Sequence, residues 1–105
     1  MGMGIGINDD PADEGALKGR QEPVACFVWF TSGGRILPKM LKYQQEDGSL
    51  REIRHIQVAS SEQKNYCGIP TIRYQCSAQM DGREVEFTLL YYIERQEWKL
   101  LWKDH

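Results

Sequence analysis

Glycine-centred turn signals divide the chain after Val24 into short segments. They are Ser32-Gly33-Gly34, Asp47-Gly48 and Asp81-Gly82. Asp-Gly between two alternating runs is a strong hairpin signal, because a type I′ turn needs positive φ at both central residues, which Asp tolerates and Gly adopts freely. Between these turns, apolar residues alternate with polar ones, which is typical of strands with one buried face. The pattern therefore predicts successive β-hairpins.

The size and the alternation together predict the fold class. At 105 residues with 41% hydrophobic content, the chain is expected to form one domain around a single core. The alternation is clearest in the runs 71–78, 85–93 and 98–102. We predict an all-β fold, a single small domain over residues 21–105 with about six antiparallel strands in up-and-down order and no helix, forming a bent sheet or a small barrel.

Three segments depart from a regular pleat. Residues 24–31 are apolar on both alternating faces, so this strand needs cover on both sides. Pro38 cannot donate to a ladder and is expected at an edge or a bulge in the returning strand. In the next strand, residues 50–60, the apolar positions change parity, which predicts a bulge at Arg54-His55. Residues 60–68 are polar and are expected to form a loop.

Charge and cysteine content indicate which partners and which cellular compartment to expect. Residues 1–20 are glycine-rich and carry four carboxylates against two basic residues, whereas the remaining 85 residues carry 11 of each sign. We predict a flexible acidic leader and a balanced body, which favours neither nucleic acid nor a membrane surface as partner. Three cysteines without a Cys-x-x-Cys pair or a secretory signal indicate a cytoplasmic protein with reduced thiols.

Several short stretches also resemble a family of small uncharacterised bacterial all-β proteins. The matching stretches are residues 34–38, 47–48, 53–58, 72–76 and 82–84, together with Trp98. The longer strand over residues 84–94 and the acidic leader depart from the family pattern. The resemblance implies one compact β domain, and no activity or functional residue is known for the family.

Catalytic and metal sites are weighed against simpler structural roles. His55, Cys67 and Cys76 are the only candidates for a soft-metal set, but their spacing matches no standard zinc pattern. Cys67 could act as a nucleophile with His55 as its base, whereas Cys76 has the pattern of a core residue. Glu84 and Glu86 share the solvated face of one strand rather than an apolar pocket. We therefore predict no catalytic residue, no metal and no cofactor, and favour a non-enzymatic role.

A nucleic-acid surface is the alternative function. Basic residues and one tyrosine cluster on the predicted second hairpin: Lys39, Lys42, Tyr43, Arg51 and Arg54. Such mixtures bind single strands on small β-barrels. Interleaved acidic residues weaken the pattern, so nucleic acid is the less favoured partner.

Apolar side chains on the outward face of two strands indicate a protein partner. Phe27 and Trp29 lie on the second face of the segment 24–31, and Leu90 and Tyr92 interrupt the polar face of the strand 84–94. The far end of the latter strand is expected to be buried on both sides. This apolarity exceeds what one thin core needs, so we predict a non-catalytic binding or assembly module, a homodimer or homo-oligomer or a binder of another protein, with these four residues at the contact.

Overall fold

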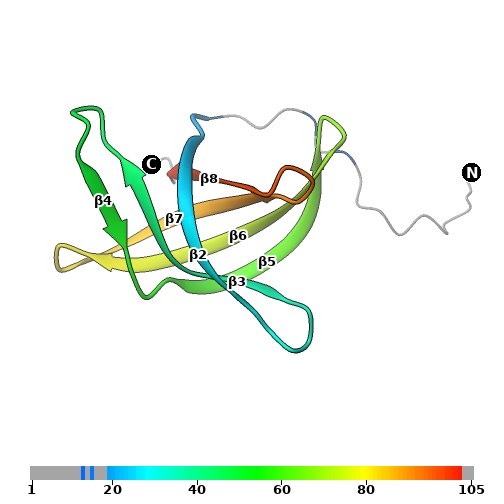
Figure 1. Cartoon of the computed structure of the whole chain (residues 1–105), viewed down its shortest axis with the longest axis horizontal. Helices are drawn as coiled ribbons and strands as arrows, with labels where there is room; N and C mark the ends of the chain where they lie inside the picture. Colours follow the sequence, from blue (N-terminus) through cyan, green and yellow to red (C-terminus); the bar gives the residue numbers. More distant parts are fainter. Residues whose placement is uncertain (1–12, 14, 16–18, 103–105) are drawn as a thin grey trace, which may run out of the picture.

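The computed structural model describes Asp13, Gly15 and residues 19–102, so most of the predicted leader and the last three residues lie outside the described part (Figure 1). The described residues form strands joined by turns, with no helix. The strands are β2 (Glu22–Phe30), β3 (Ile36–Gln44), β4 (Leu50–Ile53), β5 (Gln57–Tyr66), β6 (Ile69–Met80), β7 (Arg83–Tyr92) and β8 (Glu97–Trp102).

All seven strands belong to one antiparallel sheet in the order β4-β3-β2-β8-β7-β6-β5. Strands that follow one another in sequence are neighbours, except that β2 also pairs with β8 and that β4 and β5 are not adjacent. The predicted up-and-down order is confirmed. The sheet is bent and does not close into a barrel, because β4 and β5 are its two edges.

The strand count differs from the prediction because the third predicted strand is two strands. β4 ends at Ile53 and β5 begins at Gln57, and His55 between them has a φ of 55°. The parity change is thus accommodated by a break rather than by a bulge inside one strand. The backbone N–H of Ile56 in the break donates to the carbonyl of Lys39 at 3.1 Å, which ties the connection between β4 and β5 to β3.

The predicted polar loop over residues 60–68 is wrong. β5 continues through this segment to Tyr66 and reverses at Cys67 and Gly68, whose φ values are 51° and 79°. β5 is an edge strand and most of its side chains are exposed, so its polar composition is compatible with pairing to β6 alone. The polar composition of this segment is therefore that of an exposed edge strand and not of a loop.

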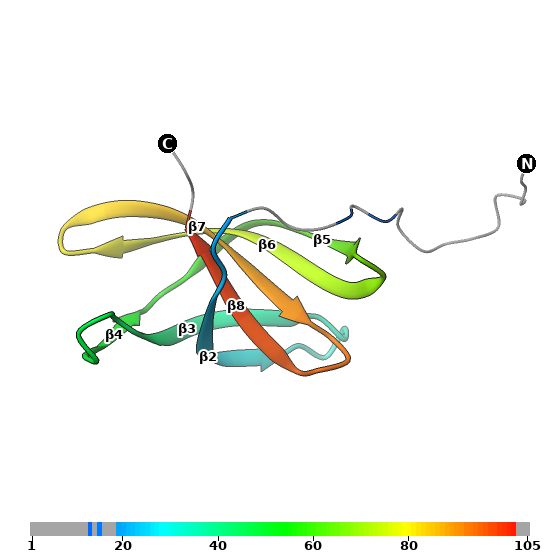
Figure 2. The ribbon, with the colours of Figure 1, turned by 90° about the horizontal axis from the view of Figure 1, so that it is seen from above.

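The bent sheet encloses an aromatic core. Viewed from above, β2 and β3 lie on one side of the molecule and β5 and β6 on the other, with β8 crossing between them (Figure 2). The Trp98 ring stacks on Tyr91 at 4.7 Å between centroids and lies 5.5 Å from Tyr74. Fully buried aliphatic side chains complete the core: Leu41, Ile53, Leu89 and Leu100. The alternation of the runs 85–93 and 98–102 predicted the inward position of Leu89 and Leu100.

A second, smaller cluster lies on the opposite face of the sheet. It contains Tyr66, Leu90 and Tyr92, with Ile69 packed against them. The Tyr92 hydroxyl donates to the side-chain oxygen of Gln21 at 2.6 Å, which ties the start of the described chain to this face. The end of β7 is therefore buried on both sides, as the sequence predicted.

Candidate interaction surface

The β2–β3 hairpin extends beyond the rest of the sheet as a two-stranded ribbon (Figure 1). β2 pairs with β8 only over Glu22–Val24, whereas it pairs with β3 from Ala25 to Phe30. β3 in turn pairs with β4 only from Leu41 onward. We call residues 25–40 the ribbon, because over this stretch the two strands have no ladder partner but each other among the residues that the structure describes.

A bulge in β3 shapes the ribbon. Phe27 pairs with Met40 and Val28 with Pro38, so Lys39 is an extra residue on the β3 side. Proline has no N–H to give to the ladder, which explains the interruption here and confirms the predicted irregularity at Pro38. The bulge directs the Lys39 ammonium over the Trp29 ring, 5.2 Å from its centroid.

One face of the ribbon packs on the core. Cys26, Val28 and Ile36 contact the core cluster as partly buried side chains. The hydroxyl of Tyr74 donates to the carbonyl of Ile36 at 2.6 Å. This hydrogen bond fastens the first residue of β3, beside the hairpin turn, to β6. These contacts fix which face of the ribbon is turned outward.

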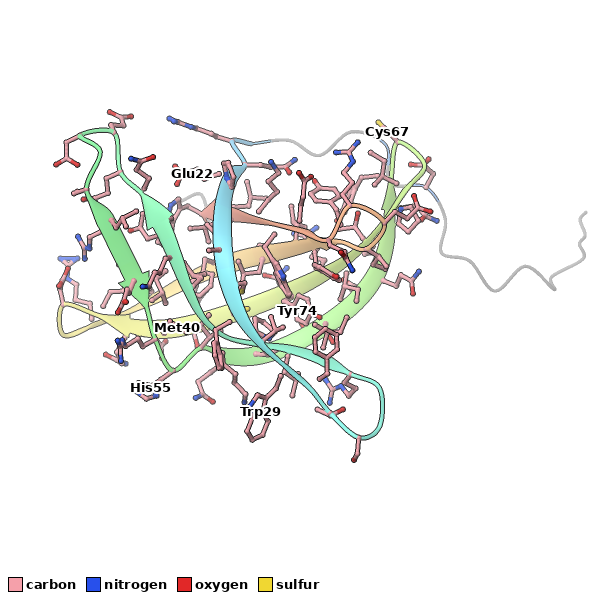
Figure 3. The ribbon with its side chains drawn as sticks, viewed as in Figure 1. Glu22, Trp29, Met40, His55, Cys67 and Tyr74 are labelled. Atoms are coloured by element: carbon pink, nitrogen blue, oxygen red, sulfur yellow. The ribbon has the colours of Figure 1, made fainter. Side chains whose placement is uncertain are left out.

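The other face is apolar and open to solvent. The outward positions include the cross-strand pairs Phe27–Met40 and Trp29–Leu37. Phe27 is 60% exposed, Trp29 61%, and Phe30 at the end of β2 72%. The Trp29 side chain points away from the body, whereas Tyr74 lies inside the fold (Figure 3). We call Phe27, Trp29, Leu37 and Met40 the ribbon face; Phe30 is exposed at the strand end but pairs with Ile36 at the alternate parity. Leu37 and Met40 were missed because only the strand register brings them beside the aromatic residues.

The other two predicted contact residues are not part of this surface. Leu90 is 0% exposed and Tyr92 6%, and both lie in the second cluster with Tyr66. Their outward apolarity is covered by the chain itself. The four predicted partner-binding residues therefore divide into an exposed pair on β2 and a buried pair on β7.

The basic cluster proposed for nucleic acid is partly paired with carboxylates of the same chain. Tyr43 is buried in the core against Trp102, with 5.8 Å between ring centroids. Each of the four cations has a contact within the chain: Lys42 and Arg54 contact Glu52 at 3.4 and 2.8 Å, Arg51 contacts Asp81 at 3.0 Å, and Lys39 lies over Trp29. Three of the four basic side chains are thus engaged by carboxylates rather than free for a phosphate backbone.

The structure does not bring the candidate metal and nucleophile residues together. Cys67 at the β5–β6 turn and His55 between β4 and β5 lie at opposite ends of the molecule (Figure 3). Cys76 is buried in the core, and burial raises the pKa of its thiol to about 12. In the part of the chain that the structure describes, no group of three or more His, Cys, Asp or Glu side chains is placed to hold a metal ion.

A polar hollow of about 660 Å³ opens at the opposite end of β2 from the ribbon tip. Its walls include Tyr43, Trp102 and Glu22, and Arg20 pairs with Glu46 across its rim at 3.7 Å. The hollow already contains its own ion pair. Its walls come from segments that are distant in sequence, so no local pattern could have indicated it.

Comparison of the chain with protein-family models, with curated proteins and with solved structures finds no match. The resemblance to small bacterial β proteins therefore stays a prediction. Within the described residues there is no helix with the length and apolarity required to cross a membrane.

Proposed function

We propose that this protein is a non-catalytic binding or assembly module that contacts a protein surface through the ribbon face. The observation that carries the proposal is the exposure of three large aromatic side chains at one end of a single hairpin. Aromatic residues are preferred anchors at protein interfaces because they contribute large contact area at low entropic cost. A cluster of this kind on a small domain is typical of an interaction site.

The way in which the ribbon is held supports the same function. Its inner face is fixed by the core and by the hydrogen bond from Tyr74 to Ile36, so the aromatic side chains are presented on a positioned backbone. Lys39 beside Trp29 gives the apolar face a charged margin. An apolar centre with a polar edge is the usual organisation of a protein contact.

We also propose that the protein works in the cytoplasm. Cys26, Cys67 and Cys76 are free thiols, two of them within the fold and one at an exposed turn. Reduced cysteines are the rule in that compartment, whereas secreted domains of this size usually carry disulfides.

The test compares the ribbon face with an equally exposed apolar residue elsewhere. Leu50 on β4 is 68% exposed and lies outside the ribbon, so Leu50→Ser is the matched control. We expect the wild type and Leu50→Ser to show the same concentration-dependent mass in sedimentation, and the double variant Phe27→Ser/Trp29→Ser to lose it.

A partner other than a second copy is detected by photo-crosslinking. A photo-reactive amino acid at position 29 should give protein adducts, and the same group at position 50 should not. The proposed function is overturned if the wild type has the mass of one chain at every concentration and position 29 yields no more adduct than position 50.

A further inference from the structure

The β8-facing edge of β2 is free along the ribbon. β2 pairs with β8 through Glu22, Pro23 and Val24 and then diverges, and over Ala25–Phe30 its described ladder partner is β3 alone. A groove of about 410 Å³ opens at this divergence, lined by residues 23–26 of β2 and residues 96–99 of β8. The sheet therefore has a vacant strand position in line with β8, bounded on one side by β2.

This edge lacks the features that usually prevent strand addition. Natural edge strands are protected by charged side chains, proline, bulges or covering segments. Residues 25–30 have the sequence Ala-Cys-Phe-Val-Trp-Phe, with no charge and no proline, and the bulge of the ribbon lies on β3. The segment is also rich in the residue types that favour extended structure.

We propose that a second copy of the chain fills this position, with the two β2 strands pairing antiparallel across a twofold axis near Val28. The inference rests on the proposed function, because it names the partner that the ribbon binds. An isologous contact of this kind uses the same patch on both copies and closes at a dimer. It continues the β2–β8 pairing of each subunit into a sheet shared by both.

The register on Val28 matches side chains as well as backbones. In antiparallel pairing about this residue, Phe27 of each copy lies opposite Trp29 of the other, so the dimer contains two such pairs. Both residues lie on the outward face in the single chain, so they meet as cross-strand neighbours on the same side of the sheet. Aromatic cross-strand pairs of this type stabilise antiparallel ladders.

Charge also complements across the axis. In this arrangement the tip of one ribbon, with Arg35, meets the β7–β8 turn of the other copy, where Glu94 and Glu97 are exposed. Arg95 in that turn lies over the Tyr92 ring, 5.9 Å from its centroid, and Lys99 further along β8 is half-buried. The turn therefore carries two exposed carboxylates and one cation, a net charge of −1 toward the incoming Arg35.

The available area indicates a reversible dimer. Phe27 and Trp29 at their observed exposures offer about 240 Å² per chain, given roughly 200 Å² for each such side chain when fully exposed. That is about a third of the roughly 800 Å² that each partner contributes to a standard stable interface. We therefore expect a dissociation constant of about micromolar order, within reach of a dilution series.

Charge reversal tests the arrangement of the two copies. Arg35→Glu and Glu97→Arg should each weaken dimerisation about tenfold, and the double variant should return to within about threefold of the wild type, because reversing both charges restores the attraction. Glu84→Arg is the matched control, since Glu84 is an exposed strand residue on the distant β6–β7 hairpin. It should leave the dissociation constant unchanged.

Hydrogen exchange distinguishes pairing through the free edge of β2 from contact through the ribbon face alone. Amides within residues 25–30 should gain protection as the protein concentration rises, and the gain should be absent in Glu97→Arg at the same concentration. If the chain dimerises without such protection, or if the double variant is as weak as the singles, edge pairing is wrong while the proposed function stands. If the chain is a monomer but crosslinks another protein from position 29, the second copy is wrong and the ribbon is still a binding surface.

Discussion

Two thiols within the fold, Cys26 and Cys76, are expected to make its stability sensitive to alkaline pH. Desolvation raises the pKa of Cys26 and of Cys76 from 9.0 to about 12, and the proximity of Cys76 adds to the effect on Cys26. The folded state thus holds these protons more tightly than the unfolded chain. Their contribution to stability is complete below pH 9 and is lost as the pH rises toward 12. We expect the free energy of unfolding, measured in urea, to fall between pH 9 and pH 11.

Variants identify the thiols as the cause. Cys76→Ala should show a shallower fall over this range, because one of the two perturbed groups is gone. Cys67→Ala is the control, since Cys67 is exposed at a turn, and it should follow the wild-type curve. An identical slope in Cys76→Ala and the wild type would contradict the assignment.

The Tyr74 hydroxyl is expected to be a measurable source of stability. Tyr74 is 2% exposed and donates to the Ile36 carbonyl at 2.6 Å. Tyr74→Phe leaves that carbonyl without its donor, so it should lower the free energy of unfolding by about 1–2 kcal/mol. Tyr43→Phe is the matched control, because Tyr43 is equally a core residue and the contact described for it is the packing of its ring against Trp102. A cost in Tyr43→Phe as large as in Tyr74→Phe would contradict the role of this hydrogen bond.

At the level of elements, local patterns predicted most of the sheet. Both predicted Asp-Gly turns are present: Asp81 and Gly82 both have positive φ, 51° and 77°, as a type I′ turn requires, whereas at Asp47-Gly48 only the glycine does, at 89°. The turn at Cys67-Gly68 was missed because cysteine is not a usual turn residue, although it adopts a φ of 51° there. The part of β5 beyond Ser60 was missed with it, since an exposed edge strand has no apolar alternation to detect.

Asp13 anchors the beginning of the described chain to the β5–β6 turn. Its carboxylate accepts hydrogen bonds from the N–H groups of Cys67 at 3.1 Å and Gly68 at 2.8 Å, and the Cys67 N–H also lies 3.1 Å from the Gly15 carbonyl. Asp13→Ala should release this segment and expose the turn. We expect faster alkylation of Cys67 and faster exchange of the Gly68 amide, with a loss of stability of about 1 kcal/mol.

An exposed carboxylate elsewhere provides the comparison. Glu62→Ala removes a charge from β5 without touching the turn, so Cys67 should alkylate at the wild-type rate. Equal rates in Asp13→Ala and the wild type would show that the contact does not protect the turn.

At the scale of the whole molecule, the sequence could predict apolarity but not what covers it. Trp29 and Leu90 have the same local signal, an apolar side chain on the face that should be polar. Leu90 is buried because β5 and the β5–β6 turn bring Tyr66 and Ile69 to the same side of the sheet. Trp29 is exposed because β8 diverges from β2 beyond Val24 and nothing described lies over the ribbon. That difference depends on strand order and length, which no local pattern contains.

Because Trp29 is exposed and Leu90 is buried, substitutions at the two positions should change the free energy of unfolding by very different amounts. Below the concentration at which the chain associates, Trp29→Ser should change the free energy of unfolding by less than about 0.5 kcal/mol, because the side chain is 61% exposed in the single chain. Leu90→Ala should lower it by about 3 kcal/mol, because a fully buried leucine leaves a cavity.

Above the concentration at which the chain associates, the wild type should gain stability with concentration and Trp29→Ser should not, since only the associating chain is stabilised by mass action. Urea unfolding at several protein concentrations measures both effects, and a large loss of stability in dilute Trp29→Ser would assign the residue to the fold rather than to an interface.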